Sequence, residues 1–343
     1  MILFIDGSSL LSTSYYGTLP KQIMFEKDPE KRESMYHMIM HTSDGRYTNG
    51  IFAFMKILTK ILNNQKPGHV FVAFDKTRAT FRRDIYSEYK GQRKATPAPL
   101  KEQFVMLENM LKDSGFVMEI SDDFEADDLI GSGVEMCKGK DSIRLYTKDQ
   151  DYFQLVDDSN NVRLWMPMDK DKLRGLNEGY RRLFGYNDSD FVSVPDGCFE
   201  FTGDTVEDYF SVPPRLVVDY KAIAGDSSDN IPGVRGVSSA ASPLLKEYGS
   251  LEAILEAIDE CEGDKKKEKE LNEFWKTNLG ISRSPMNAFK TYREDGLMSK
   301  KLAKIRTDCP LQCTMEDMQV TNIDWSKLNE WYRDLEMKSL IRE

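Results

Sequence analysis

Short apolar runs alternate with longer amphipathic segments through the first half of the chain. The apolar runs predict buried strands at 2–5, 69–74, 117–120, 143–147 and 162–165. Apolar positions that recur with helical period predict helices over 50–64, 97–113 and 126–137. Strands that alternate with helices indicate an α/β fold, in which helices flank a mainly parallel central sheet.

From about residue 213 the pattern becomes mostly helical. The Gly/Pro-rich turn DNIPGVRGV separates two apolar helical segments, which predicts a hairpin of two helices. We therefore expect an α/β core over 1–210 and a helical region over 211–343 whose C-terminal tail packs on the core. Segments 18–46 and 167–198 show no regular period, and we expect them to be irregular excursions.

Nine carboxylates stand in five separate clusters along the chain, and three of these clusters follow predicted strands. In parallel sheets ligands bind beyond the carboxyl ends of the strands. Converging carboxylates repel one another, and two hard divalent cations with oxygen ligands would hold them together. The nine residues are Asp6, Asp75, Glu125, Asp127, Asp128, Asp149, Asp151, Asp226 and Asp229. Such a two-metal site, with Mg²⁺ or with Mn²⁺ in its place, is suited to in-line displacement at phosphorus.

Any one of these clusters has a simpler explanation, because acids at turns commonly cap helices. Asp149 and Asp151 have the spacing of an extended chain, whereas Asp226 and Asp229 match one turn of a helix. Five clusters that behave alike are much harder to explain as caps than a single one. We therefore favour a metal site over a set of caps.

Charge and aromatic residues indicate the partner. The formal net charge of −10 argues against nucleic acid, although bound metal would neutralise much of the acid cluster. From Asp75 to Lys101, eight Lys and Arg residues stand against three acids, with Tyr86 and Tyr89 among them. This mixture suits a phosphate backbone and unstacked bases, but a solvated helix face would have a similar composition.

The remaining composition points to a cytoplasmic protein. The five cysteines are scattered and include no Cys-x-x-Cys pair, which argues against a zinc site or a disulfide framework. The start MILFID has no basic leader, and no apolar run reaches the length of a membrane span. We expect a monomer that does not bind membranes.

Several longer motifs are similar to those of a known family. They are FIDGSSLL, TNGIFAF, FVAFDKTRATFRRDIYSEYKGQRKATP, FEADDLIGS, TKDQDYFQLV and VVDYKAIAGDSSDNIPGV. Together they resemble the 5′ nuclease family, which comprises the 5′→3′ exonuclease domain of bacterial DNA polymerase I, phage 5′ exonucleases and flap endonucleases. Without a polymerase domain, the chain resembles a stand-alone nuclease.

The resemblance implies metal-dependent hydrolysis of phosphodiesters near 5′ ends or flap junctions, which leaves a 5′-phosphate and serves replication or repair. The implied partners are DNA with a 5′ flap, nick or free 5′ end, RNA–DNA hybrids at primers, and replication proteins such as a polymerase or a single-strand-binding protein. The resemblance implies two sets of acids, each made up of the ligands of one metal or the residues that contact those ligands. One set is Asp6, Asp75, Glu125, Asp127 and Asp128, and the other is Asp149, Asp151, Asp226 and Asp229.

The resemblance also implies a helical arch over about 76–115. Tyr89, Lys90 and Arg93 would lie at its base as catalytic residues. A cation there would stabilise the charged transition state. Arg82 and Arg83 would contact DNA nearby.

The glycines of IPGVRG would let backbone N–H groups approach a phosphate, which makes Gly233, Val234 and Gly236 candidate DNA contacts. An ordinary tight turn would look the same. The resemblance implies a helix–three-turn–helix motif that grips duplex DNA. The family usually continues as Gly-Ile-Gly-x-Lys-Thr-Ala, whereas this chain has GVSSAASP, without the lysine and with Pro243. This departure puts the phosphate contact and a K⁺ ion at the hairpin in doubt.

Two other classes of function compete with a nuclease. A DNA-junction-binding relative with weak or lost catalysis would have lost carboxylates, but all nine are present. A phosphatase with an Asp-x-Asp nucleophile at 149–151 would need neither the basic arch nor the hairpin.

Overall fold

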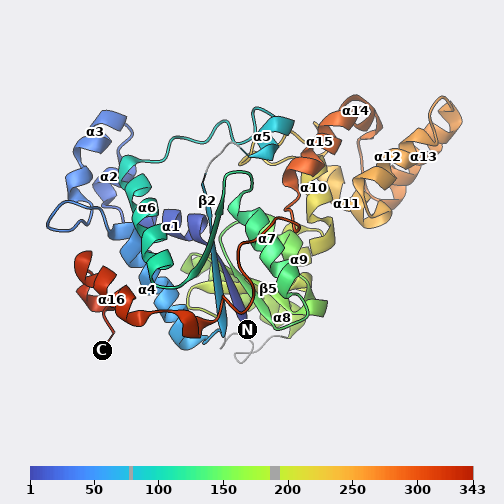
Figure 1. Cartoon of the computed structure of the whole chain (residues 1–343). Coiled ribbons are helices and arrows are strands. Elements are labelled where there is room, and N and C mark those ends of the chain that lie inside the picture. The colour runs from blue at the N-terminus through green and yellow to red at the C-terminus, as the bar shows by residue number, and fades with distance from the viewer. Residues whose placement is uncertain (77–79, 186–193, 343) are drawn as a thin grey trace.

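The computed structural model describes residues 1–76, 80–185 and 194–342. Its centre is a six-stranded sheet in the order β3-β2-β1-β4-β5-β6 (Figure 1). The strands are β1 (Ile2–Asp6), β2 (His69–Asp75), β3 (Val117–Ser121), β4 (Ile143–Tyr146), β5 (Val162–Pro167) and β6 (Cys198–Phe201). Strands β1 to β5 run parallel and β6 pairs antiparallel with β5. The predicted α/β fold with a mainly parallel sheet is confirmed.

Strand β1 shows why the apolar runs form the centre of the sheet. All five of its residues are buried. Ile2 and Phe4 belong to one apolar cluster, whereas Leu3 and Ile5 belong to another. Successive side chains of a strand point to opposite faces, so an unbroken apolar run requires cover on both sides.

Helices supply this cover. Buried residues of α7 (Ala126–Cys137) pack on the face that carries Ile2 and Phe4. Residues of α1 (Gly7–Gly17), α4 (Asn49–Asn64) and α6 (Ala98–Asp113) pack on the opposite face. The predicted helices at 50–64, 97–113 and 126–137 therefore lie where they were expected, within one residue.

Segment 167–198 contains regular structure that the prediction missed. It forms α8 (Lys170–Phe184), which begins at the cap Asp169, and it leads into β6; residues 186–193 lie outside the described part of the chain. Leu173, Leu176 and Tyr180 pack on the apolar cluster. Their spacing of three and four residues is helical, but the charged residues between them hid it. Segment 18–46 contains only the short elements α2 (Lys21–Phe25), α3 (Pro29–Ser34) and η1 (Tyr36–Met38).

The second half of the chain is helical. Its α-helices are α9 (Gly203–Phe210), α10 (Val217–Ala224), α11 (Ser238–Tyr248), α12 (Leu251–Asp259), α13 (Lys265–Asn278), α14 (Met286–Thr291), α15 (Arg293–Ala303) and α16 (Trp325–Asp334). Residues 225–237, which include the predicted turn, join α10 to α11, as a helical hairpin requires. In Figure 1, α12 and α13 project from the body, while α16 lies beside α6.

Apolar packing is continuous across residue 210. One cluster includes Phe4 and Leu145 of the sheet together with Ile223 and Leu244 of the helical region. The division of the chain at 210 therefore stays a prediction. The C-terminal tail returns to the core, where the backbone N–H of Asp324 donates to the carbonyl oxygen of Ser114 at 2.9 Å.

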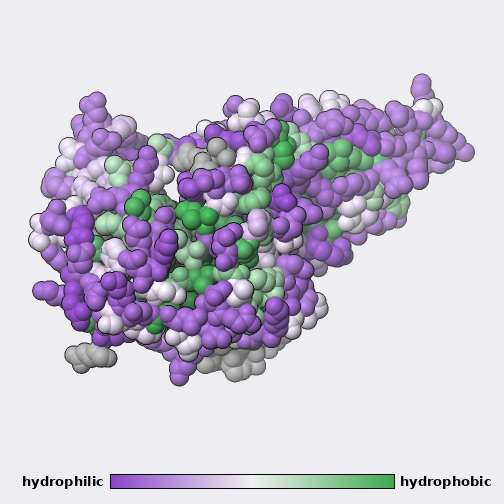
Figure 2. Space-filling view, viewed as in Figure 1, coloured by the Kyte–Doolittle hydropathy of each residue, from purple (hydrophilic) through white to green (hydrophobic). Residues whose placement is uncertain are grey.

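The segment between β2 and α6 crosses above the carboxyl edge of the sheet (Figure 1). It contains α5 (Phe81–Ile85) and an irregular stretch up to residue 97, while residues 77–79 of the predicted arch lie outside the described residues. Hydrophilic side chains cover most of the face in Figure 2, and hydrophobic ones show mainly near its middle and along the start of the projecting helices. None of the described helices is both long and apolar enough to cross a membrane.

Candidate functional site

Two neighbouring cavities lie at the carboxyl edge of the sheet, where the strand order reverses between β1 and β4. The first has a volume of about 270 Å³ and the second about 570 Å³. Ser9 and Asp149 line both. Seven of the nine predicted carboxylates line one or the other: Asp6, Asp75, Glu125, Asp127, Asp149, Asp151 and Asp226. This edge is where ligands bind in open α/β sheets.

The ends of the strands and the starts of the helices position the acids of the first cavity. Asp6 ends β1 and caps α1, since its side chain accepts from the backbone N–H of Ser9 at 2.8 Å. The hydroxyl of Thr147 donates to Asp6 at 2.9 Å. Asp75 ends β2 and accepts from the backbone N–H of Ala126, at the start of α7, at 2.8 Å. Each carboxylate is therefore held in place by one or two short bonds.

The buried acids of the first cavity would be stabilised by a nearby positive charge. Burial and the neighbouring Asp75 carboxylate raise the pKa of Asp6 to about 7. Burial also raises the pKa values of Asp127 and Asp149. Oδ1 of Asp127 and the hydroxyl of Tyr152 are buried without a hydrogen-bond partner among the described residues. A buried carboxylate oxygen without a partner is costly, so these residues fit a cation.

In the second cavity a lysine lies among the acids. The ammonium group of Lys221, which is 5% exposed, forms ion pairs with Asp226 at 2.7 Å and with Asp151. Burial opposes ionisation of Asp226, but Lys221 and nearby donors lower its pKa to about 2. The sequence prediction missed Lys221. Its signal was a lone lysine in VVDYKAIA, one turn before Asp226.

The basic side chains predicted at the base of the arch contact the acids. Lys90 Nζ lies 2.6 Å from Glu125 and 3.5 Å from Asp229. The guanidinium of Arg93 lies 2.5 Å from Asp229. The hydroxyl of Tyr89, which is buried, is 3.2 Å from Glu125 and 3.1 Å from Asp229. Asp229 therefore binds these three side chains and lines neither cavity.

No three His, Cys, Asp or Glu side chains within residues 1–76, 80–185 and 194–342 are gathered closely enough to hold a single metal ion. Two pairs of these acids instead share a lysine: Lys90 lies between Glu125 and Asp229, and Lys221 lies between Asp151 and Asp226. An ammonium group between two carboxylates supplies the positive charge that a metal ion would otherwise bring.

The predicted DNA contact of Arg82 requires a correction. Arg82 is 1% exposed and Asp128 is fully buried. The guanidinium of Arg82 donates to Asp128 at 2.6 and 2.7 Å, and to the carbonyl oxygens of Leu302 and Lys304 at 2.9 Å each. Arg82 thus has no surface for DNA, whereas Asp128 pairs with Arg82 and accepts from the backbone N–H of Glu125, so its place beside a metal stays a prediction. The pair ties α5 and α7 to the last turn of α15 and to the residue that follows it.

The hairpin turn also differs from the prediction. The backbone N–H of Gly233 donates to Ser299 at 3.0 Å, and that of Val234 donates to Ile223 at 2.9 Å. Both residues are buried. A side chain at Gly233 would meet the backbone of Gly225 at 2.4 Å, so this glycine permits a tight turn rather than a phosphate contact. Gly236 is exposed and stays a candidate DNA contact.

Arg83 is half-buried, and its side chain donates to the carbonyl oxygen of Tyr89 at 3.3 Å. Its predicted DNA contact stays a prediction.

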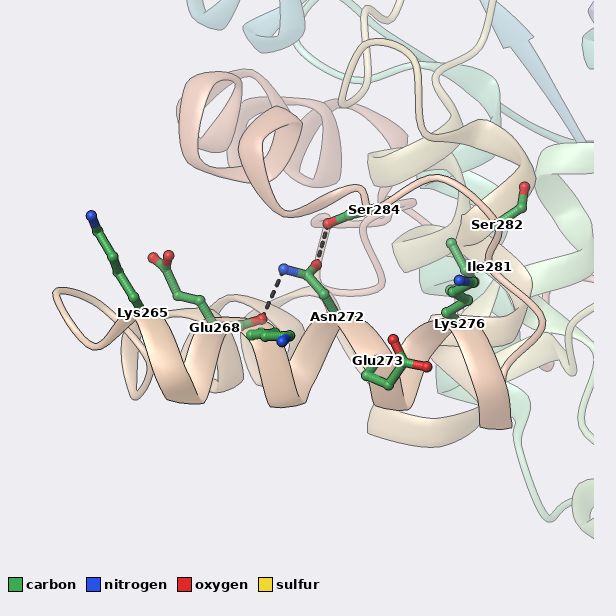
Figure 3. Close-up of a pocket in the computed structure, with 9 residues that line it drawn as sticks. Lys265, Glu268, Asn272, Glu273, Lys276, Ile281, Ser282 and Ser284 are labelled. Carbon is green, nitrogen blue, oxygen red and sulfur yellow. Dashed lines mark hydrogen bonds between the residues drawn. The ribbon is translucent and has the colours of Figure 1, made fainter.

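A third groove, of about 510 Å³, runs along α13 on the projecting helices (Figure 3). Lys265, Lys269 and Lys276 line it together with Glu268 and Glu273. Because acids alternate with lysines there, the groove has little net charge, and we assign it no part in the site.

Comparisons with known proteins indicate the family of the chain. Residues 1–181 match the family model of the 5′–3′ exonuclease N-terminal resolvase-like domain, and residues 212–326 match that of the 5′–3′ exonuclease C-terminal SAM fold. A 5′–3′ exonuclease of Aquifex aeolicus is 30% identical, over all of this chain and 94% of that protein. DNA polymerase I of Bacillus subtilis is 31% identical over 99% of this chain, which spans only 32% of that polymerase.

Solved structures share the fold. T5 5′-exonuclease, in a structure with bound zinc ions, has a TM-score of 0.55 at 18% identity and matches 98% of both chains. Human GEN1, in complex with Holliday junction DNA, has a TM-score of 0.51 at 10% identity, over 98% of this chain and 68% of that chain. On the matched family models and the relative from Aquifex aeolicus, this chain belongs to the 5′–3′ exonuclease family of nucleases.

Proposed function

We propose that this chain is a metal-dependent 5′→3′ exonuclease and structure-specific flap endonuclease that hydrolyses phosphodiesters near the 5′ ends of DNA. The observation that carries the proposal is the carboxylate edge of the sheet, with the unpartnered Asp127 oxygen in a cavity beside Lys90 and Arg93. The acids, which would hold metal ions, thus line the same cavity as Lys90 and Arg93, which would bind a phosphate.

The acids divide into two groups. Those of the first cavity that would hold one divalent cation are Asp6, Asp75, Glu125 and Asp127. Those that would hold a second are Asp149, Asp151 and Asp226. Their hard oxygen ligands suit Mg²⁺, with Mn²⁺ as a substitute. Bound in pairs, such ions lower the pKa of an attacking water and stabilise the leaving oxygen.

The chain's own residues would bind and orient the phosphate. Lys90 and Arg93 line the first cavity, where they would neutralise the charge that grows on the phosphoryl oxygens. Tyr89 would hold Glu125 and Asp229 in place through its hydroxyl. Lys221 would have to release Asp151 and Asp226 when a cation enters. Because water would be the attacking group, hydrolysis would need no side-chain nucleophile. The three histidines line neither cavity.

The proposed substrates are DNA with a 5′ flap, a nick or a free 5′ end, and RNA primers paired to DNA. A T5 flap endonuclease with the same fold has been solved in complex with DNA and metal ions, at a TM-score of 0.55 and 17% identity. Relatives that are DNA polymerases point to replication and repair as the setting, with a polymerase as a partner.

The test is a product map on 5′-labelled flap DNA, nicked duplex and RNA-primed duplex, each with Mg²⁺ and with excess chelator. A small phosphomonoester serves as the comparison substrate. We expect Mg²⁺-dependent cleavage near the flap junction and no turnover of the monoester. Binding of the flap without cleavage would indicate a DNA-junction-binding protein, and turnover of the monoester alone would indicate a phosphatase. Full activity in chelator would refute the metal mechanism.

A further inference from the structure

Two segments far apart in the sequence are joined next to the first cavity. One is the loop 88–93, which carries Lys90 and Arg93, and the other is the turn that contains Asn230. The backbone N–H of Lys90 donates to the carbonyl oxygen of Asp229 at 2.9 Å. The side-chain amide of Asn230 donates to the carbonyl oxygen of Glu88 at 2.7 Å and accepts from Gln92 at 3.2 Å. Asn230 therefore holds the loop on both sides of Lys90.

The backbone at both ends of this contact is unusual. Lys90 has φ 53° and Asn230 has φ 57°, which lie in the left-handed region. Asparagine adopts that region several-fold more readily than most residues, whereas lysine adopts it only rarely. A strained backbone at a functional residue persists only when its surroundings hold it. Around Lys90 these surroundings are the bond that its own N–H donates to Asp229 and the bonds of Asn230 to Glu88 and Gln92.

The turn that carries Asn230 is itself closed. Asp226 and Ile231 exchange two backbone hydrogen bonds, at 2.9 and 2.8 Å, so that residues 226–231 form a small ring. Asp226 lines the second cavity, and Asp229 accepts from Arg93. The side chain of Asn230 lines neither cavity. Asn230 thus connects the loop 88–93 to the turn 226–231, and its own side chain stays outside both cavities.

We propose that Asn230 is a positioning residue, which fixes Lys90 and Arg93 relative to the acids so that both can contact the scissile phosphate. The inference rests on the proposed nuclease function. It adds that the cations work only when the turn at 226–231 holds their loop. Loss of the Asn230 side chain would therefore slow the chemical step without weakening the hold on DNA.

The key variant is Asn230→Gly, because glycine keeps the left-handed backbone and removes both side-chain bonds. We expect the single-turnover cleavage rate on flap DNA at saturating Mg²⁺ to fall about 10-fold or more, with the dissociation constant in Ca²⁺ changed less than about 2-fold. Asn161→Gly is the matched control. Asn161 also has φ 53° and also accepts a side-chain bond, from Arg144, but it precedes β5 at the opposite end of the sheet. It should keep the normal rate.

Epistasis decides how Asn230 acts. In the Lys90→Ala Arg93→Ala background, Asn230→Gly should lower the rate no further, because its effect passes through those two cations. Equal fold losses in both backgrounds would overturn the proposal, as would a normal rate in Asn230→Gly itself.

Hydrogen exchange tests the positioning claim without catalysis. Amides in the peptide 86–97 should exchange faster in Asn230→Gly than in the wild type, while peptides from α4 should not change. Unchanged exchange in 86–97 would also overturn the proposal. A wild type that cleaves no flap DNA would instead refute the nuclease function, and the exchange result would still decide the role of Asn230.

Discussion

At the scale of single residues, Asp149 and Asp151 belong to the acids that would hold the second metal ion. Asp149 lines both cavities, and its side chain accepts from the backbone N–H of Asp151 at 2.9 Å. We expect Asp149→Asn or Asp151→Asn to lower turnover by orders of magnitude, because each removes a charge that would bind metal. Flap binding in Ca²⁺ should be unchanged or tighter, since one source of repulsion toward phosphate is lost.

Asp157→Asn is the control for these two variants. Asp157 also caps a short helix, but, against the effect of burial, its hydrogen bonds lower its pKa to about 2, opposite to the raised pKa of Asp149, and it lines neither of the two cavities. Turnover of this variant should stay normal. Near-normal turnover of Asp149→Asn or Asp151→Asn at saturating Mg²⁺ would show that the mutated residue does not hold the metal.

Individual residues also show what sequence reasoning missed. An arginine in a basic stretch looks like a DNA contact, and the partners that bury Arg82 lie 46 to 222 positions away along the chain. Lys221 has the same difficulty, since its partner Asp151 is 70 positions distant. Pairings of this kind depend on the tertiary fold, whereas Asp6 and Asp75 could be placed because each directly ends an apolar run.

At the scale of elements, the loop after α5 brings the cations to the acids. Lys90 pairs with Glu125, and Arg93 pairs with Asp229. The arrangement of the site depends on these ion pairs. We expect Lys90→Ala and Arg93→Ala each to lower the single-turnover rate by roughly 10²–10³, by analogy with the loss of an oxyanion donor. Affinity should change little, because the contact strengthens in the transition state.

Lys76→Ala is the control from the same basic stretch. Lys76 pairs with Asp122 at 2.7 Å on the surface and lines neither cavity, so its loss should affect binding slightly or not at all. If Lys90→Ala and Arg93→Ala raised only the dissociation constant, at an unchanged single-turnover rate, the loop would attract DNA by its charge and would have no catalytic role.

The hairpin between α10 and α11 gives the second prediction at this scale. Val234 and Gly233 direct their N–H groups into the protein, and the family's usual lysine is missing from GVSSAASP. We expect binding of nicked duplex to depend on general salt screening, with the same affinity in K⁺ and Na⁺ at equal ionic strength. Fluorescence anisotropy in the two salts measures this. Clearly tighter binding in K⁺ would show that an ion site persists in the turn.

At the scale of the whole molecule, the sequence was most informative where burial is two-sided. Strands β1 and β2 follow from unbroken apolar runs that are buried on both sides, and the order of the sheet places the acids at one edge. Strand β6 was missed because it lies at the edge of the sheet. Cys198–Phe201 pair with β5 only after the chain has made a long excursion, which the sequence pattern does not show. Helix α8 was missed because its buried stripe is narrow and its other positions are highly charged.

The acid cluster also affects the stability of the whole molecule. The pKa of Asp6 rises from its ordinary value of 3.8 to about 7, through burial and the charge of Asp75. The folded state therefore holds this proton more tightly than the unfolded chain does. The resulting stabilisation is complete below about pH 4 and is lost as the pH rises towards 7. Asp127 and Asp149 shift in the same direction, whereas Asp226 shifts to about 2, below this window.

In chelator, we therefore expect the melting temperature of the wild type to fall as the pH rises from 4.5 to 7.5. The free energy at stake for Asp6 is at most roughly 4 kcal/mol, since one pKa unit corresponds to about 1.4 kcal/mol. Asp6→Asn, which has no proton to lose, should show a shallower fall, and the difference between the two proteins isolates Asp6 from histidines and net charge. Mg²⁺ should raise the melting temperature of the wild type most at pH 7.5, because a cation favours the ionised acids. Parallel pH profiles for the two proteins in chelator would show that the charge of Asp6 is already compensated within the protein, which would remove the electrostatic argument for a cation beside it.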